Sequence, residues 1–125
     1  MVSIQTAVLK PDTRLQTRQI TPELIKYIIK KIVDEISPRQ IILFGSYARE
    51  HTTDASDLDL FIVHDSPVSN REVRRRIEYL LRGRYFDLDL IVRTSREVTR
   101  NLADGNPFYT RHIFGEGKVL YDRPA

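Results

Sequence analysis

The sequence predicts an α/β or α+β domain in which helices flank a small mixed β-sheet. Three short apolar runs, at residues 41–44, 57–63 and 85–92, have the composition and spacing of buried or half-buried strands. Between them lie segments whose apolar residues recur three and four positions apart, as on one face of a helix. The predicted order of elements is α-β-α-β-α-β-α-α-β, and 125 residues are enough for one such domain with a single core.

Composition places the chain among ordinary globular domains, because apolar residues make up 41% and charged residues 30% of it. No apolar run approaches the ~20 residues that a membrane span needs, so no membrane association is expected. Cysteine is absent, which excludes disulfides and thiolate metal sites. The first residues show no secretory signal, and a cytoplasmic location is the expectation.

The first predicted helix follows a polar, weakly patterned segment at residues 1–20, for which we expect an extended arm or a frayed end. The domain proper is expected over residues 21–125. Thr21-Pro22-Glu23 supplies a capping hydroxyl, a proline at the first helical position and an acid near the positive helix end. Ser37-Pro38 ends the helix. Its apolar face consists of Ile25, Ile28, Ile29, Ile32 and Ile36.

A strand, a tight turn and a second strand come next. Residues 41–44 are an all-apolar stretch, and Gly45-Ser46 then turns the chain into a short helix or loop before the strand at 57–63. Asp57 and Asp59 lie two apart on this strand, so they point to one face while Leu58 and Leu60 point to the core. Ionised carboxylates side by side repel each other, and a divalent cation such as Mg²⁺ or Mn²⁺ relieves the repulsion.

Capped helices are predicted on both sides of the third strand. Ser69 with Glu72 has the spacing of a capping box, and Gly83 can end the helix that the box opens. Thr94 with Glu97 predicts a second capping box. The remaining predicted elements are the end of that helix at residues 104–107, a short helix to about Phe114 and a closing edge strand at 118–121.

The third strand repeats the pattern of the second, with Asp87 and Asp89 on one face. If the two strands are neighbours, a third carboxylate can join the pair, and three carboxylates can hold two metal ions. At the turn, Gly45 permits close backbone approach, and the hydroxyl of Ser46 with free N–H groups can hold phosphate oxygens. Arg49 lies one helical turn further on, within reach of the same phosphates.

A resemblance to a known family rests on these residues. The run Gly45-Ser46-Tyr47-Ala48-Arg49, followed by Ser56-Asp57-Leu58-Asp59-Leu60, resembles the signature of the DNA polymerase beta-like nucleotidyltransferase superfamily. The short chain is similar to its minimal nucleotidyltransferases (MNT proteins), which are often encoded beside HEPN-domain partners in toxin–antitoxin pairs. The resemblance covers about residues 25–121 and implies the polymerase beta-like fold. It also implies that the Gly-Ser pair holds a nucleoside triphosphate, that the two Asp bind Mg²⁺, and that a third Asp completes a two-metal site.

Two positions decide how well the family pattern fits. The family's third acid is followed by apolar positions and then by a threonine that opens a capped helix, which favours Asp89 over Asp87. Members commonly have glycine after the arginine, whereas this chain has Glu50. That departure concerns the local turn and not the metal site.

The resemblance implies transfer of a nucleoside monophosphate, AMP from ATP, to a hydroxyl group with release of pyrophosphate. Because the catalytic fold is expected to take up these 125 residues, we expect the acceptor to be presented by a partner, by a second copy of the chain, or not at all. The MNT resemblance points to a HEPN-type toxin that adenylylation silences, with this chain as its antitoxin. Two alternatives stay open: a stand-alone enzyme that modifies a small molecule such as an aminoglycoside, and an antitoxin that acts by binding alone.

Other side chains allow weaker interpretations. The three histidines, His51, His64 and His112, follow no ligand spacing and are expected to be structural or solvent-facing. Tyr47 and Tyr109 are expected to pack rather than to stack on a base. A cluster of arginines fits either a patch for RNA, phosphates or an acidic protein, or a solvated helix face, and it leaves direct nucleic-acid binding open. It consists of Arg71, Arg74, Arg75, Arg76, Arg82 and Arg84.

Overall fold

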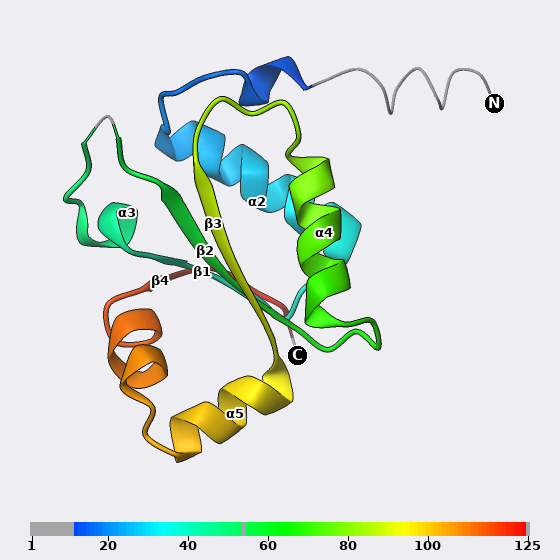
Figure 1. The fold of residues 1–125 in the computed structure, drawn as a ribbon, viewed down its shortest axis with the longest axis vertical. Coiled ribbons are helices and arrows are strands. Elements are labelled where there is room, and N and C mark those ends of the chain that lie inside the picture. The colour runs from blue at the N-terminus through cyan, green and yellow to red at the C-terminus, as the bar shows by residue number, and fades with distance from the viewer. Residues whose placement is uncertain (1–11, 54, 125) are drawn as a thin grey trace.

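The computed structural model describes residues 12–53 and 55–124 and confirms the predicted mixed fold, built on one four-stranded sheet (Figure 1). The strands lie in the order β3-β2-β1-β4, with β1 antiparallel to both of its neighbours and β2 parallel to β3. In chain order the elements are the 3₁₀ turn η1 (Thr13–Leu15), α2 (Pro22–Ile36), β1 (Gln40–Phe44), α3 (Ser46–Arg49), β2 (Leu58–His64), α4 (Asn70–Leu80), β3 (Leu88–Thr94), α5 (Ser95–Ala103), the π-helical turn η2 (Phe108–Ile113) and β4 (Lys118–Asp122).

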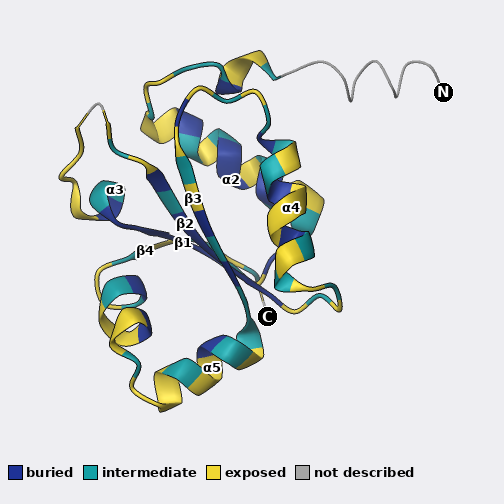
Figure 2. Ribbon diagram, in the orientation of Figure 1, coloured by how far each residue is buried: buried dark blue, intermediate teal, exposed yellow. Residues whose placement is uncertain are grey.

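Two cores lie on opposite faces of the sheet (Figure 2). The first core fills the space between the sheet and helices α2 and α4, and the second lies between the sheet and α5 with η2. Strand residues alternate between the two, because successive side chains of a strand point to opposite faces. Leu58, Leu60 and Ile62 of β2 enter the first core. The second core consists of Ile42, Phe44, Phe61, Val63, Val98, Tyr109 and Ile113.

Helix α2 has the predicted start, stop and buried face. The Thr21 hydroxyl accepts a hydrogen bond from the Leu24 N–H at 3.1 Å, and Pro22 occupies the first helical position. Ser37 ends the helix in the left-handed region, with φ of 50°. Ile28 and Ile32 are fully buried against the sheet. Across all described residues, no helix has both the length and the apolar character that a membrane span requires.

The two predicted capping boxes differ in the structure. At α5 the box is complete: the Glu97 N–H donates to the Thr94 hydroxyl at 3.1 Å, and the Thr94 N–H donates to the Glu97 carboxylate at 2.9 Å. At α4 only the Ser69 half is present, and the Glu72 carboxylate accepts hydrogen bonds from Arg75 and Arg76 instead. Charge-assisted bonds from guanidinium groups compete with the neutral N–H of a cap, which explains the difference.

Residues 12–20, for which an extended arm or frayed end was expected, pack against the domain. Leu15 is fully buried in the first core, and its carbonyl accepts a hydrogen bond from the Tyr85 N–H at 3.2 Å. Asp12 accepts a hydrogen bond from Lys31 of α2 at 2.7 Å. The burial of Leu15 and the ion pair between Asp12 and Lys31 therefore attach this segment to the domain. The rest of the expected arm, residues 1–11, lies outside the described residues.

Candidate active site

One row of side chains crosses three strands at the end of the sheet where β2 and β3 begin. In the parallel pairing of β2 with β3, Asp59 lies directly beside Asp89. In the antiparallel pairing of β1 with β2, Phe44 lies on the other side of Asp59. Direct ladder neighbours share a face of the sheet, so Asp89, Asp59 and Phe44 form a continuous row. Phe44 belongs to the second core, which places the row on the face that η2 covers.

Asp59 is the most enclosed of the carboxylates in this region. It is half-buried, whereas Asp57 and Asp89 are exposed. Burial, together with the negative charges of Asp89 and then Asp57, raises the pKa of Asp59 to about 6, while the positive fields of His112 and Arg49 act in the opposite direction. Asp89 and Asp57 therefore lie close enough to Asp59 for their charges to act on its carboxylate.

Gly45 lies directly against the Asp59 carboxylate. A Cβ atom added to Gly45 would lie 2.0 Å from Oδ2 of Asp59, far inside van der Waals contact. The backbone of Gly45 has φ of +72° and ψ of −150°, a region that only glycine enters without strain. The sequence predicted close approach at this glycine, but it assigned the approaching group to a phosphate. In the structure the carboxylate of Asp59 fills this space.

Helix α3 positions the other residues of the Gly-Ser motif. No side chain caps its first turn, and Ser46, its first residue, is half-buried. The Arg49 guanidinium lies 3.7 Å from the carboxylate of Glu116, and the Arg49 side chain is 42% exposed. Glu50 follows with φ of 60° and ψ of 29°, in the left-handed region. The structure thus shows why glycine suits this position in the family, and that the turn forms with glutamate as well.

The two candidates for the third carboxylate differ in their surroundings. Asp89 lies in the ladder beside Asp59. Asp87 precedes β3, and its backbone carbonyl accepts a hydrogen bond from the Leu58 N–H at 2.9 Å. Both side chains are exposed. The geometry therefore favours Asp89 as the neighbour of Asp59, in line with the family pattern.

His112 lies nearer the carboxylates than its sequence context suggested. Its ring packs against Phe44, with ring centroids 5.5 Å apart, and its field acts on Asp59. No spacing in the sequence predicted this, because the position depends on the π-helical turn η2. His64, by contrast, is buried at the other end of β2, where it accepts from the Ser66 N–H and bonds to Asn70.

The carboxylates fit a divalent cation in donor type and charge. Within the described ranges, 12–53 and 55–124, no three acidic, histidine or cysteine side chains converge on one point as a ready-made metal cage. Asp59 and Asp89 lie side by side in the ladder instead, with Asp57 just before β2, and Asp59 shows the electrostatic strain that a cation relieves. Hard oxygen donors of this kind suit Mg²⁺ or Mn²⁺.

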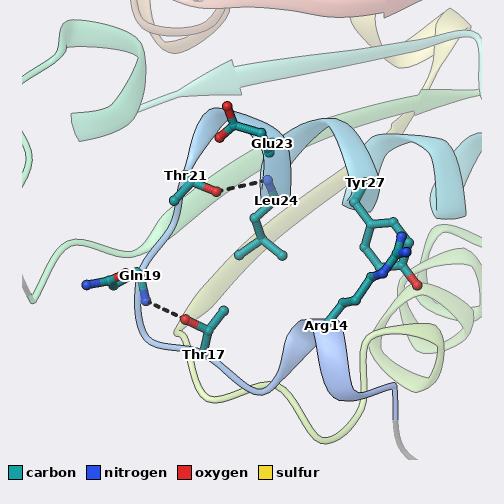
Figure 3. A pocket seen from close by; sticks show the side chains of 7 residues that line it. All are labelled: Arg14, Thr17, Gln19, Thr21, Glu23, Leu24 and Tyr27. Carbon is teal, nitrogen blue, oxygen red and sulfur yellow. Dashed lines mark hydrogen bonds between the residues drawn. The ribbon is translucent and has the colours of Figure 1, made fainter.

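A pocket of about 380 Å³ lies elsewhere, between the segment after η1 and the start of α2 (Figure 3). The guanidinium of Arg14 lies over the ring of Tyr27, 4.9 Å from its centroid, on one side of this pocket. Because α2 covers the first core and the carboxylate row faces the second, the pocket is on the opposite face of the sheet from the row. It is therefore separate from the candidate site.

Comparison with known proteins identifies the class to which this fold and site belong. A sequence profile of the nucleotidyltransferase domain matches residues 25–120. Two curated relatives from Methanocaldococcus jannaschii, both named as candidate protein adenylyltransferases, are similar in sequence. MJ1379 is 32% identical over 83 residues and MJ0126 is 28% identical over 81 residues. Each match covers 65% of this chain and 83% of the relative.

The chain belongs to the nucleotidyltransferase domain family, as its signature residues predicted, and it is an enzyme of the nucleotidyltransferase class. Among solved structures, a candidate nucleotidyltransferase from Sulfolobus solfataricus aligns over 92% of both chains, with a TM-score of 0.58 and 19% identity. This likeness concerns the fold. A chain of the MntA–HpeT toxin–antitoxin complex aligns more loosely, with a TM-score of 0.46 and 21% identity over 84% of this chain and 75% of that one.

Proposed function

We propose that the chain is a metal-dependent adenylyltransferase that transfers AMP from ATP to a hydroxyl group of a HEPN-type protein in the cytoplasm, and that it acts in this way as an antitoxin. The observation that carries the proposal is the in-register pairing of Asp59 with Asp89, beside Gly45 and the start of α3. The relatives' names support a protein as the acceptor and AMP as the transferred group. The MNT resemblance supports the HEPN-type partner.

Each site residue has a role that its position supports. Asp57 and Asp59 would hold the divalent cation, which when bound neutralises triphosphate charge and lowers the pKa of an acceptor hydroxyl. The backbone and hydroxyl of Ser46, at the start of α3, would hold phosphate oxygens. Arg49 would add a charged hydrogen bond to the same phosphates, because its present contact with Glu116 is long and exposed.

The transfer itself requires little covalent chemistry from the protein. The acceptor oxygen forms a bond to the α-phosphorus of ATP while the bond from that phosphorus to the bridging oxygen breaks, and pyrophosphate leaves with the electron pair. The proton of the hydroxyl passes to the Asp89 carboxylate, which is exposed and so accessible to an incoming acceptor. Positioning and charge neutralisation account for most of the rate in such reactions.

The experiment that tests this proposal follows label transfer to any HEPN-type protein that is encoded beside this chain. With ATP labelled at the α-phosphate the partner should become labelled, and with ATP labelled at the γ-phosphate it should not. The double substitution Asp57→Asn with Asp59→Asn should abolish labelling, whereas Asp104→Asn, an exposed acid at the end of α5, should leave it unchanged.

The alternatives give different results when label transfer and neutralisation of the toxin are both measured. Label that reaches a small hydroxyl compound without any partner protein would assign the chain to the stand-alone enzymes. Neutralisation of the toxin by the double variant, without labelling, would assign it to the antitoxins that act by binding. Transfer of the γ-label would contradict a nucleotidyltransferase mechanism altogether.

A further inference from the structure

An aromatic cluster continues the carboxylate row towards η2. Phe44, the ladder neighbour of Asp59, packs edge-on against Phe108 and His112, with ring centroids 6.4 Å and 5.5 Å away. The rings of Phe108 and His112 lie 5.3 Å apart and are tilted by 40°. Phe44 is buried, whereas Phe108 is 38% exposed. The cluster therefore offers an aromatic surface to solvent directly beside the carboxylates.

The turn η2, which contains Phe108 and His112, packs on the second core. Tyr109 and Ile113 of η2 are buried in the second core, where Tyr109 packs edge-on against Phe61 at 5.7 Å. The Asn106 side chain accepts a hydrogen bond from the Phe108 N–H at 3.1 Å. Because π-helical turns are rare and frequently occur at functional sites, a well-packed turn of this kind that exposes a phenylalanine calls for a functional explanation.

The proposed function places ATP at the carboxylate row, and the ligand of the aromatic surface is inferred from that placement. This inference therefore rests on the proposed function. If the carboxylates and Ser46 engage the triphosphate of ATP, the base of the same molecule has to lie a nucleotide's length away along the site. A base has two flat, weakly polar faces, and aromatic side chains are the usual surfaces on which bases stack. We propose that the nucleobase of the bound nucleotide stacks on Phe108 and His112, which makes η2 the base-binding element of the enzyme.

Stacking also limits what this surface can distinguish. Every base has a π-face, so a stacking platform supplies affinity without reading the hydrogen-bonding edge of the base. Phe108 and His112 should therefore strengthen the binding of ATP and GTP to a similar degree. The contribution should be absent for inorganic tripolyphosphate, which has the phosphates and no base.

The test compares the dissociation constants of ATP and tripolyphosphate, both with Mg²⁺, by calorimetry. Phe108→Ala should weaken ATP binding by roughly tenfold or more, the range measured for single stacked bases, and leave tripolyphosphate binding unchanged. Phe108→Leu, which keeps apolar packing against Phe44, should give the same split between the two ligands. Tyr79→Ala removes an aromatic side chain of similar exposure (43%) from α4, on the other side of the sheet, and should change neither constant.

The outcomes separate this inference from the proposed function. ATP binding that is unchanged in both Phe108 variants, or equal affinity of the wild type for ATP and tripolyphosphate, would overturn the base platform and leave the transferase proposal intact. Loss of both ligands in Phe108→Leu would also overturn it, because the side chain would then serve the whole site. A wild type that binds neither ligand would contradict the proposed function itself, and the platform with it.

Discussion

The position of the Asp59 carboxylate requires a glycine at position 45. The carboxylate of Asp59 occupies the space where any other residue at position 45 would have its Cβ. This contact brings the most enclosed acid of the row next to the start of α3, where phosphate binding is expected. Gly45 thus has two roles: it leaves room for the Asp59 carboxylate, and it adopts the backbone conformation of the turn.

Substitution of Gly45 by alanine should therefore remove activity as well as stability. The added methyl group would force Asp59 out of the row, and the backbone would remain in a glycine-only region, at a cost of about 1–3 kcal/mol. We expect label transfer to fall by about 100-fold or more. Gly105→Ala is the matched control, because Gly105 also has positive φ (+67°) but no atom near its Cβ position. The control should lose stability and keep activity, and equal activity in the two variants would contradict the role of Gly45.

Glu50 is the residue at which this chain departs from the family pattern. Its backbone adopts the left-handed conformation, with φ of 60°. A left-handed conformation costs a non-glycine residue about 1 kcal/mol or more. Its side chain recovers little, since the contact with Lys118 is 3.6 Å long and exposed.

Glu50→Gly should consequently stabilise the domain by about 0.5 kcal/mol, after the greater freedom of glycine in the unfolded chain offsets part of the gain. Urea unfolding measures the change. Glu50→Ala loses the same ion pair without relief of the backbone, so it should be less stable than the wild type. A glycine variant less stable than the alanine variant would show that no strain exists at this position.

At the scale of elements, the pairing of β2 with β3 decides which acids meet. The sequence correctly placed Asp59 and Asp89 on strand faces, because alternation of side chains is a local property, whereas Asp57 lies one residue before β2. It left Asp87 and Asp89 as alternatives on spacing alone, because a register is set by long-range pairing and not by local pattern. The observed ladder puts Asp89 beside Asp59.

The repulsion within this row should be measurable in the absence of metal. Asp59→Asn removes one of the negative charges, and we expect the metal-free variant to gain about 1 kcal/mol, allowing for solvent screening, or roughly 4 °C in Tm. Mg²⁺ should raise the Tm of the wild type and have a much smaller effect on the variant. A thermal shift assay with and without EDTA gives all four values, and an equal Mg²⁺ effect on both proteins would exclude Asp59 as a ligand.

The start of α5 should make the fold sensitive to acid. Hydrogen bonds from the Asn70 side chain and from the Thr94 N–H lower the pKa of Glu97. In the acidic range the unfolded chain therefore binds more protons than the folded one, so stability falls as pH decreases through the lowered pKa. Glu97→Gln should flatten the dependence of unfolding free energy on pH between about pH 5 and pH 3. Glu35→Gln, at an exposed position of α2, should retain the wild-type slope, and identical slopes for both variants would contradict this role of Glu97.

At the scale of the whole molecule, the larger core lies on one face of the sheet and the candidate active site lies on the other. The first core, under α2 and α4, contains most of the buried apolar side chains. The second core is smaller and leaves the end of its face free for the carboxylate row and the aromatic surface of η2. Substitutions under α2 and α4 are therefore expected to change stability first, and substitutions around η2 to change ligand binding first.

Most of this architecture was predictable from the sequence, and the exceptions have identifiable causes. Helix α2 and the α5 cap follow from local signals that nothing else in the fold opposes. The Glu72 half of the α4 cap failed because neighbouring arginines compete for the same carboxylate. The burial of Leu15 and the position of His112 depend on contacts between distant parts of the chain, which no local pattern records.

The measurement that bears most directly on the proposed transferase is the intact mass of the HEPN-type partner after incubation with this chain, ATP and Mg²⁺. The expected result is a mass increase of one or more AMP groups with the wild type, and none with Asp57→Asn/Asp59→Asn or with EDTA. An unchanged partner mass in the presence of folded wild-type protein that binds ATP would contradict transfer to this partner. The same mass increase with the double variant would contradict the assignment of these two carboxylates.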